Sequence, residues 1–474
     1  MMDTKDFREQ AHKLVDWIAD YFENIDQYPV KAQVNPGDII NKLSKNIPDK
    51  GESMEAIFQD FQDIIMPGIT HWQNPKFFAY FPSNNSYPSI LGELLASALG
   101  AQTMKWETSP AAAELEEHVM SWLRAMLGLP SSFSGVIQDT ASTSTLASLI
   151  MARENKSGFA INERGITSEN SYKVYCSSET HSSTEKGMKI MGLGRKNLRK
   201  IPVCEDFSMD VNELESAINK DLSNNAVPMC VVATIGTTGS TAIDPLESIA
   251  ALCKKHSIWL HVDAAYAGSA LILPEYQWMI KGIEQADSFV FNPHKWLFTN
   301  FDCTAFFVKD SGILLKTFEI LPEYLKTKND GVVNNYCDWG VTLGRRFRAL
   351  KLWFVLRSFG LNGLQDKIRG HIRMAMEFSQ KLEHHPDFVI LAPTALNLIC
   401  FQYRPNDIDN PNQLNQLNEA LMHSINDSGK MYITHTKLNG CFALRLVAGQ
   451  TNLQEKHMEE AWEIILNATS KVNQ

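Results

Sequence analysis

The pattern of apolar and polar positions divides the chain into three parts. Near the N-terminus, apolar residues recur three and four positions apart, at Phe7, Ala11, Leu14, Val15, Ile18 and Phe22. This spacing predicts an amphipathic helix with one apolar stripe. The stripe packs either on its own domain or, because Pro29 and Pro36 follow it on an N-terminal arm, on a partner subunit. We predict an N-terminal helical arm within residues 1–84.

From about residue 85 to residue 320, short apolar runs alternate with helical patterns. The clearest runs are 173–176, 230–234, 258–262 and 289–291. A helical stretch, 244–256, separates the second run from the third. Continuous apolar strands separated by helices are typical of a mostly parallel sheet that is covered on both faces. We therefore predict a large α/β domain over residues 85–360.

The last part of the chain begins with a helical pattern from about residue 345. Short strand patterns follow at 388–391, 396–401 and 442–447, and a final helical pattern lies near 454–467. This order predicts a smaller α+β domain over residues 361–474. We interpret the asparagine-rich patch at 406–418 as a solvated loop.

Composition excludes several classes of protein. The chain has 474 residues, of which 44% are hydrophobic, and a formal net charge of −10 without any basic block, so we do not expect a nucleic-acid partner. Eight scattered cysteines without a C-x-x-C pair argue against a zinc site and a disulfide framework, and indicate a reducing cytoplasm. The polar N-terminus and the lack of an apolar run of about 18 residues predict a soluble protein without a signal peptide or membrane span.

Reactive side chains directly follow the four apolar runs: His181, the pair Thr237 and Thr238, Asp263, and Lys295. Each has a structural explanation when taken alone. His181 could be a loop histidine, the two threonines turn residues, Asp263 a helix cap, and Lys295 a lysine that extends to water. Ligands in open α/β sheets bind outside the carboxyl ends of the strands. We therefore expect these side chains to lie together at one edge of the sheet.

Lys295 stands between two apolar runs, in SFVFNPHKWLF. Because desolvating an ammonium group is costly, such a lysine is usually paired, deprotonated or used covalently. Thr140, Ala141 and Ser142 lie where an extended stretch passes into a helix, so they form either an ordinary helix cap or a phosphate cradle. A lysine, a carboxylate and a phosphate cradle together are what pyridoxal phosphate requires.

The stretches HVDAAYAGSALILPE, FNPHKWLFTNFDC and WGVTLGRRFRALKLWFVLRSFG resemble the pyridoxal-dependent group II decarboxylases that include aromatic-L-amino-acid decarboxylase. The segments NPKFFAYFPSNNSYPSILGELLASALGA and FREQAHKLVDWIADYF are similar to the entrance segment and swapped arm of that family. The resemblance extends over nearly the whole chain. It implies fold type I, bound pyridoxal phosphate and a homodimer with shared active sites.

The resemblance also implies residue roles. Lys295 becomes the Schiff-base residue, Asp263 the partner of the ring nitrogen, and His181 the residue that stacks on the ring. The remaining cofactor residues are Thr140, Ala141, Ser142, Thr238, Ala265, Asn292 and His294. The substrate residues are Trp72, Tyr80, Phe81, Pro82, Ser83, Gln102, Met104, Leu343 and Gly344. Tyr324, in LPEYLK, matches a loop tyrosine that protonates the substrate carbon, and Tyr336 matches it less well.

Two departures from the family pattern leave the substrate open. Asp139 and Thr140 replace a Gly-Ser pair, and Gln102 and Met104 stand where bulky apolar residues are usual. We expect decarboxylation of an aromatic L-amino acid: tryptophan, 5-hydroxytryptophan, DOPA, tyrosine or phenylalanine. The alternatives are an aromatic aldehyde synthase, a decarboxylase of another amino acid such as glutamate or histidine, and a cofactor-binding protein without turnover. The resemblance ties the aldehyde outcome to loss of the loop tyrosine or the stacking histidine, and this chain retains candidates for both.

Overall fold

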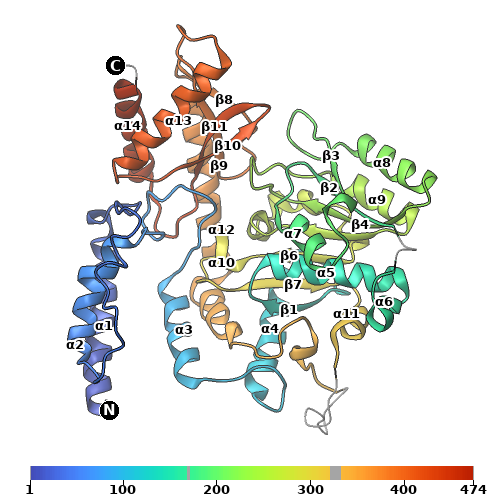
Figure 1. Ribbon diagram of the computed structural model, residues 1–474, viewed down its shortest axis with the longest axis horizontal. Helices are drawn as coiled ribbons and strands as arrows, with labels where there is room; N and C mark the ends of the chain where they lie inside the picture. The colour runs from blue at the N-terminus through green and yellow to red at the C-terminus, as the bar shows by residue number, and fades with distance from the viewer. Residues whose placement is uncertain (1, 168–170, 321–331, 473–474) are drawn as a thin grey trace. The chain divides into compact units, whose positions relative to one another are not determined.

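The computed structural model describes residues 2–167, 171–320 and 332–472. The chain divides into two compact units. Figure 1 shows their helices and strands. Unit 1 contains Met1–Pro82, Gln380–Leu391 and Phe401–Gln474, and unit 2 contains Ser83–Ser379 and Ala392–Cys400. The N-terminal segment and the C-terminal segment are thus grouped in unit 1. The three-part division at residues 84 and 360 stays a prediction.

Unit 2 is built on a seven-stranded sheet with the order β1-β7-β6-β5-β4-β2-β3. The strands are β1 (Ser134–Gln138), β2 (Tyr172–Ser177), β3 (Leu198–Ile201), β4 (Val227–Thr234), β5 (Trp259–Asp263), β6 (Ser288–Phe291) and β7 (Thr304–Val308). Neighbouring strands from β3 to β6 are parallel, whereas β7 runs antiparallel to both β6 and β1. The predicted mostly parallel α/β fold is confirmed.

The helices of unit 2 are α3 (Tyr87–Leu99), α4 (Pro110–Met126), α5 (Ala141–Ser157), α6 (Ala160–Arg164), α7 (Ser183–Ile190), α8 (Val211–Ser223), α9 (Leu246–His256), α10 (Pro293–Trp296) and α11 (Ser311–Phe318). The long helix α12 (Arg348–Glu383) begins in this unit. Helix α5 crosses one face of the sheet and contacts β1, β4, β5, β6 and β7 (Figure 1). Because helices cover the sheet, every residue of β5, β6 and β7 is buried.

Unit 1 combines helices with a four-stranded sheet, which confirms the predicted α+β character of the C-terminal part. Its helices are α1 (Thr4–Glu23), α2 (Met54–Asp60), α13 (Pro411–Asp427) and α14 (Glu455–Val472). The strands of this sheet are β8 (Phe388–Ile390), β9 (Leu398–Tyr403), β10 (Thr434–Leu438) and β11 (Cys441–Val447), in the order β10-β11-β9-β8. The first three residues of β9 are grouped in unit 2.

The interpretation of residues 406–418 as a solvated loop is wrong, because α13 begins within this patch. Asn410 caps the helix by accepting hydrogen bonds from the N–H groups of Asn412 (2.9 Å) and Gln413 (3.3 Å). Pro411 occupies the first turn, where its missing N–H costs nothing. Asn418 is fully buried, and its amide exchanges two 2.7 Å hydrogen bonds with the backbone of Tyr403. These asparagines therefore cap a helix and join it to a strand.

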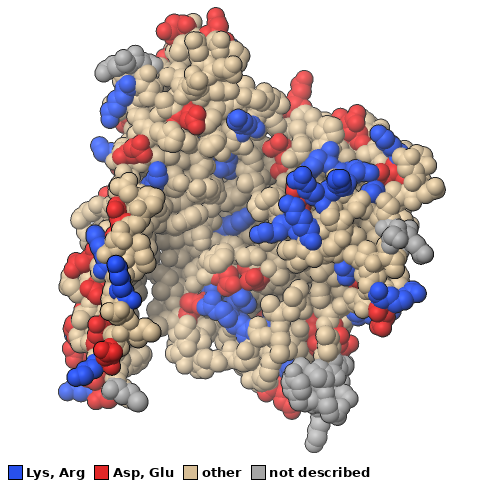
Figure 2. Space-filling view, in the orientation of Figure 1, with Lys and Arg blue, Asp and Glu red and all other residues tan. Residues whose placement is uncertain are grey.

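Charged side chains of both signs are distributed over the visible surface, with one concentration of Lys and Arg over the region of β2, β3 and α7 (Figure 2). The short segment from 186 to 200, which ends α7 and includes most of β3, contains Lys186, Lys189, Arg195, Lys196, Arg199 and Lys200. Within the described ranges, no helix combines the length and apolar character needed to cross a membrane.

Candidate functional site

Asp263 is the last residue of β5 and lies between two parallel neighbours at the same edge of the sheet. It is in register with Thr234 of β4 on one side and with Val290 of β6 on the other. Beyond the strands, the Asn292 N–H donates a 3.0 Å hydrogen bond to the carbonyl oxygen of Ala265. The segments that follow β5 and β6 are thereby joined, as expected from the order of apolar runs.

Lys295 lies on the single turn α10, directly after β6. Its N–H donates to the carbonyl oxygen of Asn292 (2.9 Å), and its own carbonyl oxygen accepts a 2.8 Å hydrogen bond from the side chain of Asn84. Asn84 is fully buried, and its N–H donates to the carbonyl oxygen of His294 (3.2 Å). Asn84 therefore fixes the backbone of the lysine turn. Sequence reasoning missed it, since no local pattern relates Asn84 to a residue 211 positions away.

Three charged or titratable side chains act on one another at this edge. Burial lowers the pKa of the Lys295 amine, and the negative charge of Asp263 partly opposes this shift. Burial also lowers the pKa of His181, and the charges of Lys295 and Lys200 lower it further while Asp263 raises it. Because these charges act on one another, Lys295, Asp263 and His181 lie near one another in one site. A lowered pKa makes the neutral, nucleophilic form of a lysine amine easier to reach.

His181 follows β2 and precedes α7. The N–H of Ser183 donates a 3.2 Å hydrogen bond to His181 Nδ1, and the Ser183 hydroxyl lies 2.9 Å from the same atom. Because Nδ1 accepts from a backbone N–H, the proton of the neutral ring is on Nε2. The imidazole is oriented by its own loop and remains accessible to solvent.

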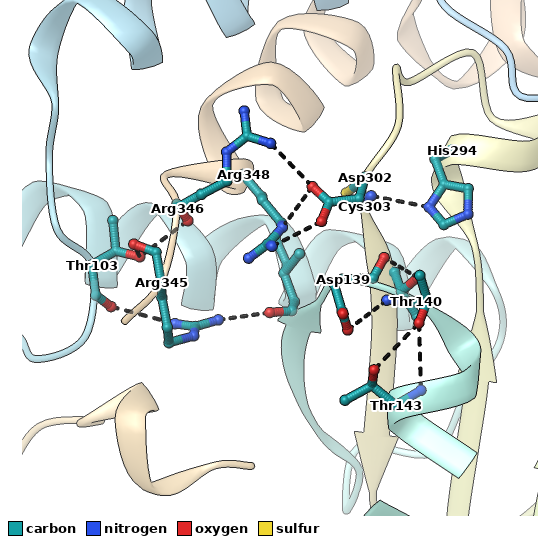
Figure 3. Close-up of polar contacts among 12 residues, drawn as sticks. Thr103, Asp139, Thr140, Thr143, His294, Asp302, Cys303, Arg345, Arg346 and Arg348 are labelled. Carbon is teal, nitrogen blue, oxygen red and sulfur yellow. Dashed lines mark hydrogen bonds and ion pairs between the residues drawn. The ribbon is translucent and has the colours of Figure 1, made fainter. Parts of the chain in front are cut away.

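The first turn of α5 lies at the same edge as Lys295. Thr140 is the N-cap, and its hydroxyl accepts from the N–H of Thr143, whereas its own N–H donates to Asp139 Oδ1 at 2.7 Å (Figure 3). Helix geometry leaves the N–H groups of Ala141 and Ser142 without an acceptor inside the helix. A helix N-terminus of this kind favours an anion. The Thr140 side chain serves the cap, so its direct contact with a phosphate stays a prediction.

Thr304, the first residue of β7, joins the ends of β1 and β6. Its hydroxyl donates to the carbonyl oxygen of Asp139 (3.0 Å) and lies 2.9 Å from Asn292 Oδ1. The predicted phosphate residues on α5 and after β6 are therefore linked through a single buried hydroxyl. Sequence reasoning missed Thr304, because its role depends on the antiparallel placement of β7 between β1 and β6.

His294 precedes Lys295 and is held in one tautomer. The Cys303 N–H donates a 3.0 Å hydrogen bond to His294 Nδ1, so the proton of the ring is on Nε2 (Figure 3). Burial lowers the pKa of His294 to about 3. Asp302, the residue before Cys303, is held by Arg348 through hydrogen bonds of 3.0 and 2.9 Å. His294 is thus a neutral donor beside the lysine at ordinary pH.

The threonine pair after β4 has two different environments. Thr237 is fully buried, and its hydroxyl accepts a 3.1 Å hydrogen bond from the N–H of Ala242. Thr237 therefore stabilises its own turn. Thr238 is exposed and remains the candidate for a ligand contact.

The predicted substrate residues fall into two groups that are described within separate units. In unit 1, Trp72 stacks on Tyr80 with ring centroids 5.8 Å apart, and the Arg445 guanidinium lies 5.6 Å from the Phe81 ring. Pro82 ends this unit. Trp72 and Tyr80 thus form a stacked pair, and the contact of all these residues with substrate stays a prediction.

In unit 2, Gln102 and Gly344 line one cavity of about 340 Å³. Gln102 Oε1 accepts a 2.6 Å hydrogen bond from the N–H of Arg345, and the carbonyl oxygen of Met104 accepts one of 2.8 Å from Cys337. Ser83 is half-buried and Leu343 is exposed. The structure brings Gln102 and Gly344 together, and the contact of this group with substrate also stays a prediction.

Of the two candidate proton donors, Tyr324 and Tyr336, the structure describes only Tyr336. Tyr324 lies outside the described residues. Tyr336 is only 2% exposed, packs against Trp339 at 5.3 Å between ring centroids, and lies under the Arg345 guanidinium at 5.0 Å. Burial strongly raises the pKa of Tyr336.

These groups fit pyridoxal phosphate. Lys295 offers an amine whose pKa is lowered by burial, and Asp263 offers a carboxylate at the neighbouring strand end. His181 offers an aromatic ring, and the start of α5 offers N–H groups for a phosphate. The set combines a covalent attachment point with a ring-nitrogen partner and an anion site, which is what this cofactor needs.

Comparison with known proteins gives the same assignment. Residues 36–404 match the pyridoxal-dependent decarboxylase conserved domain. Tyrosine decarboxylase 3 of Petroselinum crispum is 41% identical over 477 residues, which cover 98% of this chain and 92% of that protein. Phenylacetaldehyde synthase of Arabidopsis thaliana is 41% identical over 479 residues, covering 99% and 97%. The structure of Catharanthus roseus tryptophan decarboxylase in complex with L-tryptophan gives a TM-score of 0.93 at 38% identity, with 99% of each chain covered.

Both the extent of the family match and the identity to these relatives confirm the resemblance seen in the sequence motifs. The cofactor is pyridoxal phosphate, and the reaction class is that of a carboxy-lyase. This chain belongs to the pyridoxal-dependent decarboxylase family.

Proposed function

We propose that this chain decarboxylates an aromatic L-amino acid to the corresponding amine and CO2. The observation that carries the proposal is the grouping of Lys295, Asp263 and His181 at one sheet edge, in a chain 41% identical to a tyrosine decarboxylase and structurally similar to a tryptophan decarboxylase. The stacked pair of Trp72 and Tyr80 supports a flat apolar substrate.

Bound pyridoxal phosphate supplies an electron sink for the pair released when CO2 leaves. The Lys295 amine is the covalent attachment point, and the Asp263 carboxylate holds a positive charge on the ring nitrogen. His181 covers one face of the ring, while Ala141, Ser142 and Asn292 bind the phosphate. Thr140, Thr238, Ala265 and His294 complete the cofactor site in this proposal.

Tyr324 is proposed as the group that delivers a proton to the substrate carbon after CO2 leaves. The burial of Tyr336 against Trp339 and Arg345 supports this choice, because Tyr336 already has a packing role.

A second candidate function is oxidative conversion of the amino acid to an aldehyde. The 41% identity to phenylacetaldehyde synthase favours it, since that relative is as similar as the tyrosine decarboxylase. The presence of His181 and Tyr324 supports the amine-forming reaction. The experiment is a panel of tryptophan, 5-hydroxytryptophan, DOPA, tyrosine, phenylalanine, glutamate and histidine, with CO2, amine, aldehyde and peroxide measured in parallel. CO2 with an equal amount of aromatic amine is expected, and aldehyde with peroxide would select the second candidate.

We further propose a cytoplasmic homodimer. Helix α1 has no buried residue, and Phe7 and Val15 are 61% and 50% exposed on its apolar stripe. On α3, Leu94 and Leu99 are 55% and 66% exposed. Exposed apolar rows of this kind support burial against a second copy. Deletion of residues 1–25 is expected to dissociate the dimer in sedimentation, and a stable active dimer after the deletion would contradict the role of α1.

A further inference from the structure

A buried network of polar side chains lies within the sheet and α5, apart from the groups with assigned roles. Its members are Trp259 and His261 of β5, Ser288 of β6, and Thr145 and Ser148 of α5. Each of them is at most 5% exposed. Burying a polar group costs folding free energy unless the group is hydrogen-bonded. A fully hydrogen-bonded network of these five side chains would make the surrounding sheet and helix more rigid.

The network forms a continuous chain of hydrogen bonds. Trp259 Nε1 donates to Ser148 Oγ at 3.0 Å, and Ser148 Oγ lies 2.7 Å from Ser288 Oγ. Ser288 Oγ lies 2.9 Å from His261 Nδ1, and His261 Nε2 lies 3.3 Å from Thr145 Oγ1.

The indole of Trp259 can only donate, and it lies 3.0 Å from Ser148 Oγ and 3.4 Å from Ser288 Oγ. If Ser148 donates onward to Ser288, then Ser288 donates to His261 Nδ1, and each serine hydroxyl makes one bond as acceptor and one as donor. In this order His261 carries its proton on Nε2 and donates it to Thr145.

His261 connects the three elements that carry the cofactor groups. Side chains alternate along a strand, so His261 and Asp263 point to the same face of β5. Ser288 begins β6, which ends at Phe291, three positions before His294 and four before Lys295 on the turn α10. Thr145 lies one turn into the helix that begins at Ala141.

His261 acts in this network as a neutral group. Burial lowers its pKa to about 4, and the negative charge of Asp263 only partly opposes the shift. A neutral imidazole can accept at one nitrogen and donate at the other, which the two contacts to Ser288 and Thr145 require.

We propose that His261 is a positioning residue for the cofactor: by linking β5 to β6 and α5, it fixes Asp263 relative to Lys295 and to the first turn of α5. The inference rests on the proposed role of Asp263 at the ring nitrogen. It concerns the binding and ionisation of pyridoxal phosphate, so it is independent of which amino acid is the substrate.

The test compares four variants by two cofactor measurements. Apoenzyme is titrated with pyridoxal phosphate to obtain the dissociation constant, and the pH midpoint of the visible absorption band is measured for the reconstituted protein. Ser288→Ala and His261→Phe are expected to raise the dissociation constant about three- to tenfold, the loss expected for a buried hydrogen bond, and to shift the midpoint. Thr145→Val removes one longer contact and should have a smaller effect. His261→Asn retains a polar group near the Nδ1 position and should recover part of the affinity.

The matched control is His457→Gln in unit 1. His457 is 3% exposed, and its Nδ1 accepts a 3.0 Å hydrogen bond from the N–H of Gln454. This variant should lower the melting temperature of the apoenzyme without changing the dissociation constant or the midpoint. If the network variants behave like the control, with both cofactor measurements within about twofold of wild type, His261 has only a packing role.

A variant that does not fold and a failure of the proposed role of Asp263 can each be told apart from a failure of the His261 proposal. If His261→Phe fails to fold, the near-isosteric Thr145→Val and Ser288→Ala decide the matter by the same criteria. If Asp263→Asn leaves the midpoint unchanged while the network variants shift it, the proposed role of Asp263 fails and His261 cannot act through it. Failure of the substrate panel would leave these cofactor measurements unaffected.

Discussion

The hydroxyl of Thr304 lies 2.9 Å from Asn292 Oδ1. Through this contact the first residue of β7 fixes the side chain that directly follows β6. The same hydroxyl donates to the carbonyl oxygen of Asp139, just before α5. Register explains the geometry: Thr304 of β7 pairs with Gln138 of β1, and the next residue, Ala305, pairs with Phe291 of β6. One buried hydroxyl thus joins both sides of the proposed phosphate site.

Thr304→Val replaces this hydroxyl with a methyl group of similar volume. The change removes the hydroxyl that contacts both Asn292 Oδ1 and the Asp139 carbonyl oxygen, and it is expected to weaken pyridoxal phosphate binding about three- to tenfold, measured by titration of the apoenzyme. Thr317→Val is a suitable control, because Thr317 is 8% exposed and its hydroxyl donates within α11, to the Ile313 carbonyl oxygen at 2.7 Å. Equal affinities of the two variants would contradict a role for Thr304 in the cofactor site.

Lys295→Ala is expected to abolish turnover and covalent cofactor attachment. An external amine cannot replace a tethered one, whose effective molarity is on the order of 10⁵ M or more. Borohydride reduction of the wild-type holoenzyme followed by peptide mapping should place the cofactor on Lys295. Label on any other lysine would overturn the assignment.

Asp263→Asn should retain the cofactor but lower kcat. The amide oxygen can still accept the 3.0 Å hydrogen bond from the Ala265 N–H, so the local fold is preserved. A neutral amide does not stabilise a charged ring nitrogen, and each pKa unit lost there corresponds to about 1.4 kcal/mol, or tenfold in rate. Cofactor content by absorbance and kcat by CO2 release distinguish the two effects. A kcat close to wild type would make Asp263 a structural residue.

Tyr324→Phe removes one hydroxyl and should slow amine formation by about 100-fold or more, the usual contribution of a positioned general acid. Some substrate should then react with molecular oxygen and give aldehyde, ammonia and peroxide. Tyr336→Phe is the matched variant, and it should change amine formation little because the Tyr336 ring packs against Trp339. Unchanged amine formation in Tyr324→Phe, with loss in Tyr336→Phe, would transfer the role to Tyr336.

The stability of the protein should depend on His294 in mildly acidic solution. Burial depresses its pKa from 6.5 to about 3, so the unfolded state binds more protons between these values. Its contribution is therefore fully present above pH 6.5 and is lost as the pH falls towards 3, at about 1.4 kcal/mol per pH unit.

His294→Gln is expected to reduce this pH dependence of the free energy of urea unfolding between pH 6.5 and 4. The comparison must be made against wild type, because burial raises the pKa of Asp244 to about 7 and of Asp287 to about 6, and these carboxyls act in the opposite direction over the same window. His423→Gln, at an exposed position, is the control. Equal slopes for wild type and His294→Gln would contradict the expected shift.

The local pattern of the sequence determined the strands and the reactive edge. The apolar runs before His181, Asp263 and Lys295 become β2, β5 and β6, and their parallel arrangement brings the residues that follow them to one side. This prediction succeeded because buried parallel strands need continuous apolar residues, and their carboxyl ends then share an edge. Pattern alone mistook the asparagines at 410–418 for solvated loop residues, because a capping or buried asparagine looks like an exposed one until its partner is known.

The tertiary structure alone decided which distant residues support the site. Asn84 bonds to a carbonyl 211 positions away, Thr304 joins β1 to β6 through the antiparallel β7, and His261 meets Thr145 across 116 residues. None of these pairs shares a periodic pattern, since each depends on strand order and on the helix laid across the sheet. The sequence by itself determined the reactive side chains and the edge where they gather, because these follow from local periodicity. Their positions relative to one another depend on hydrogen bonds that only the assembled fold can form.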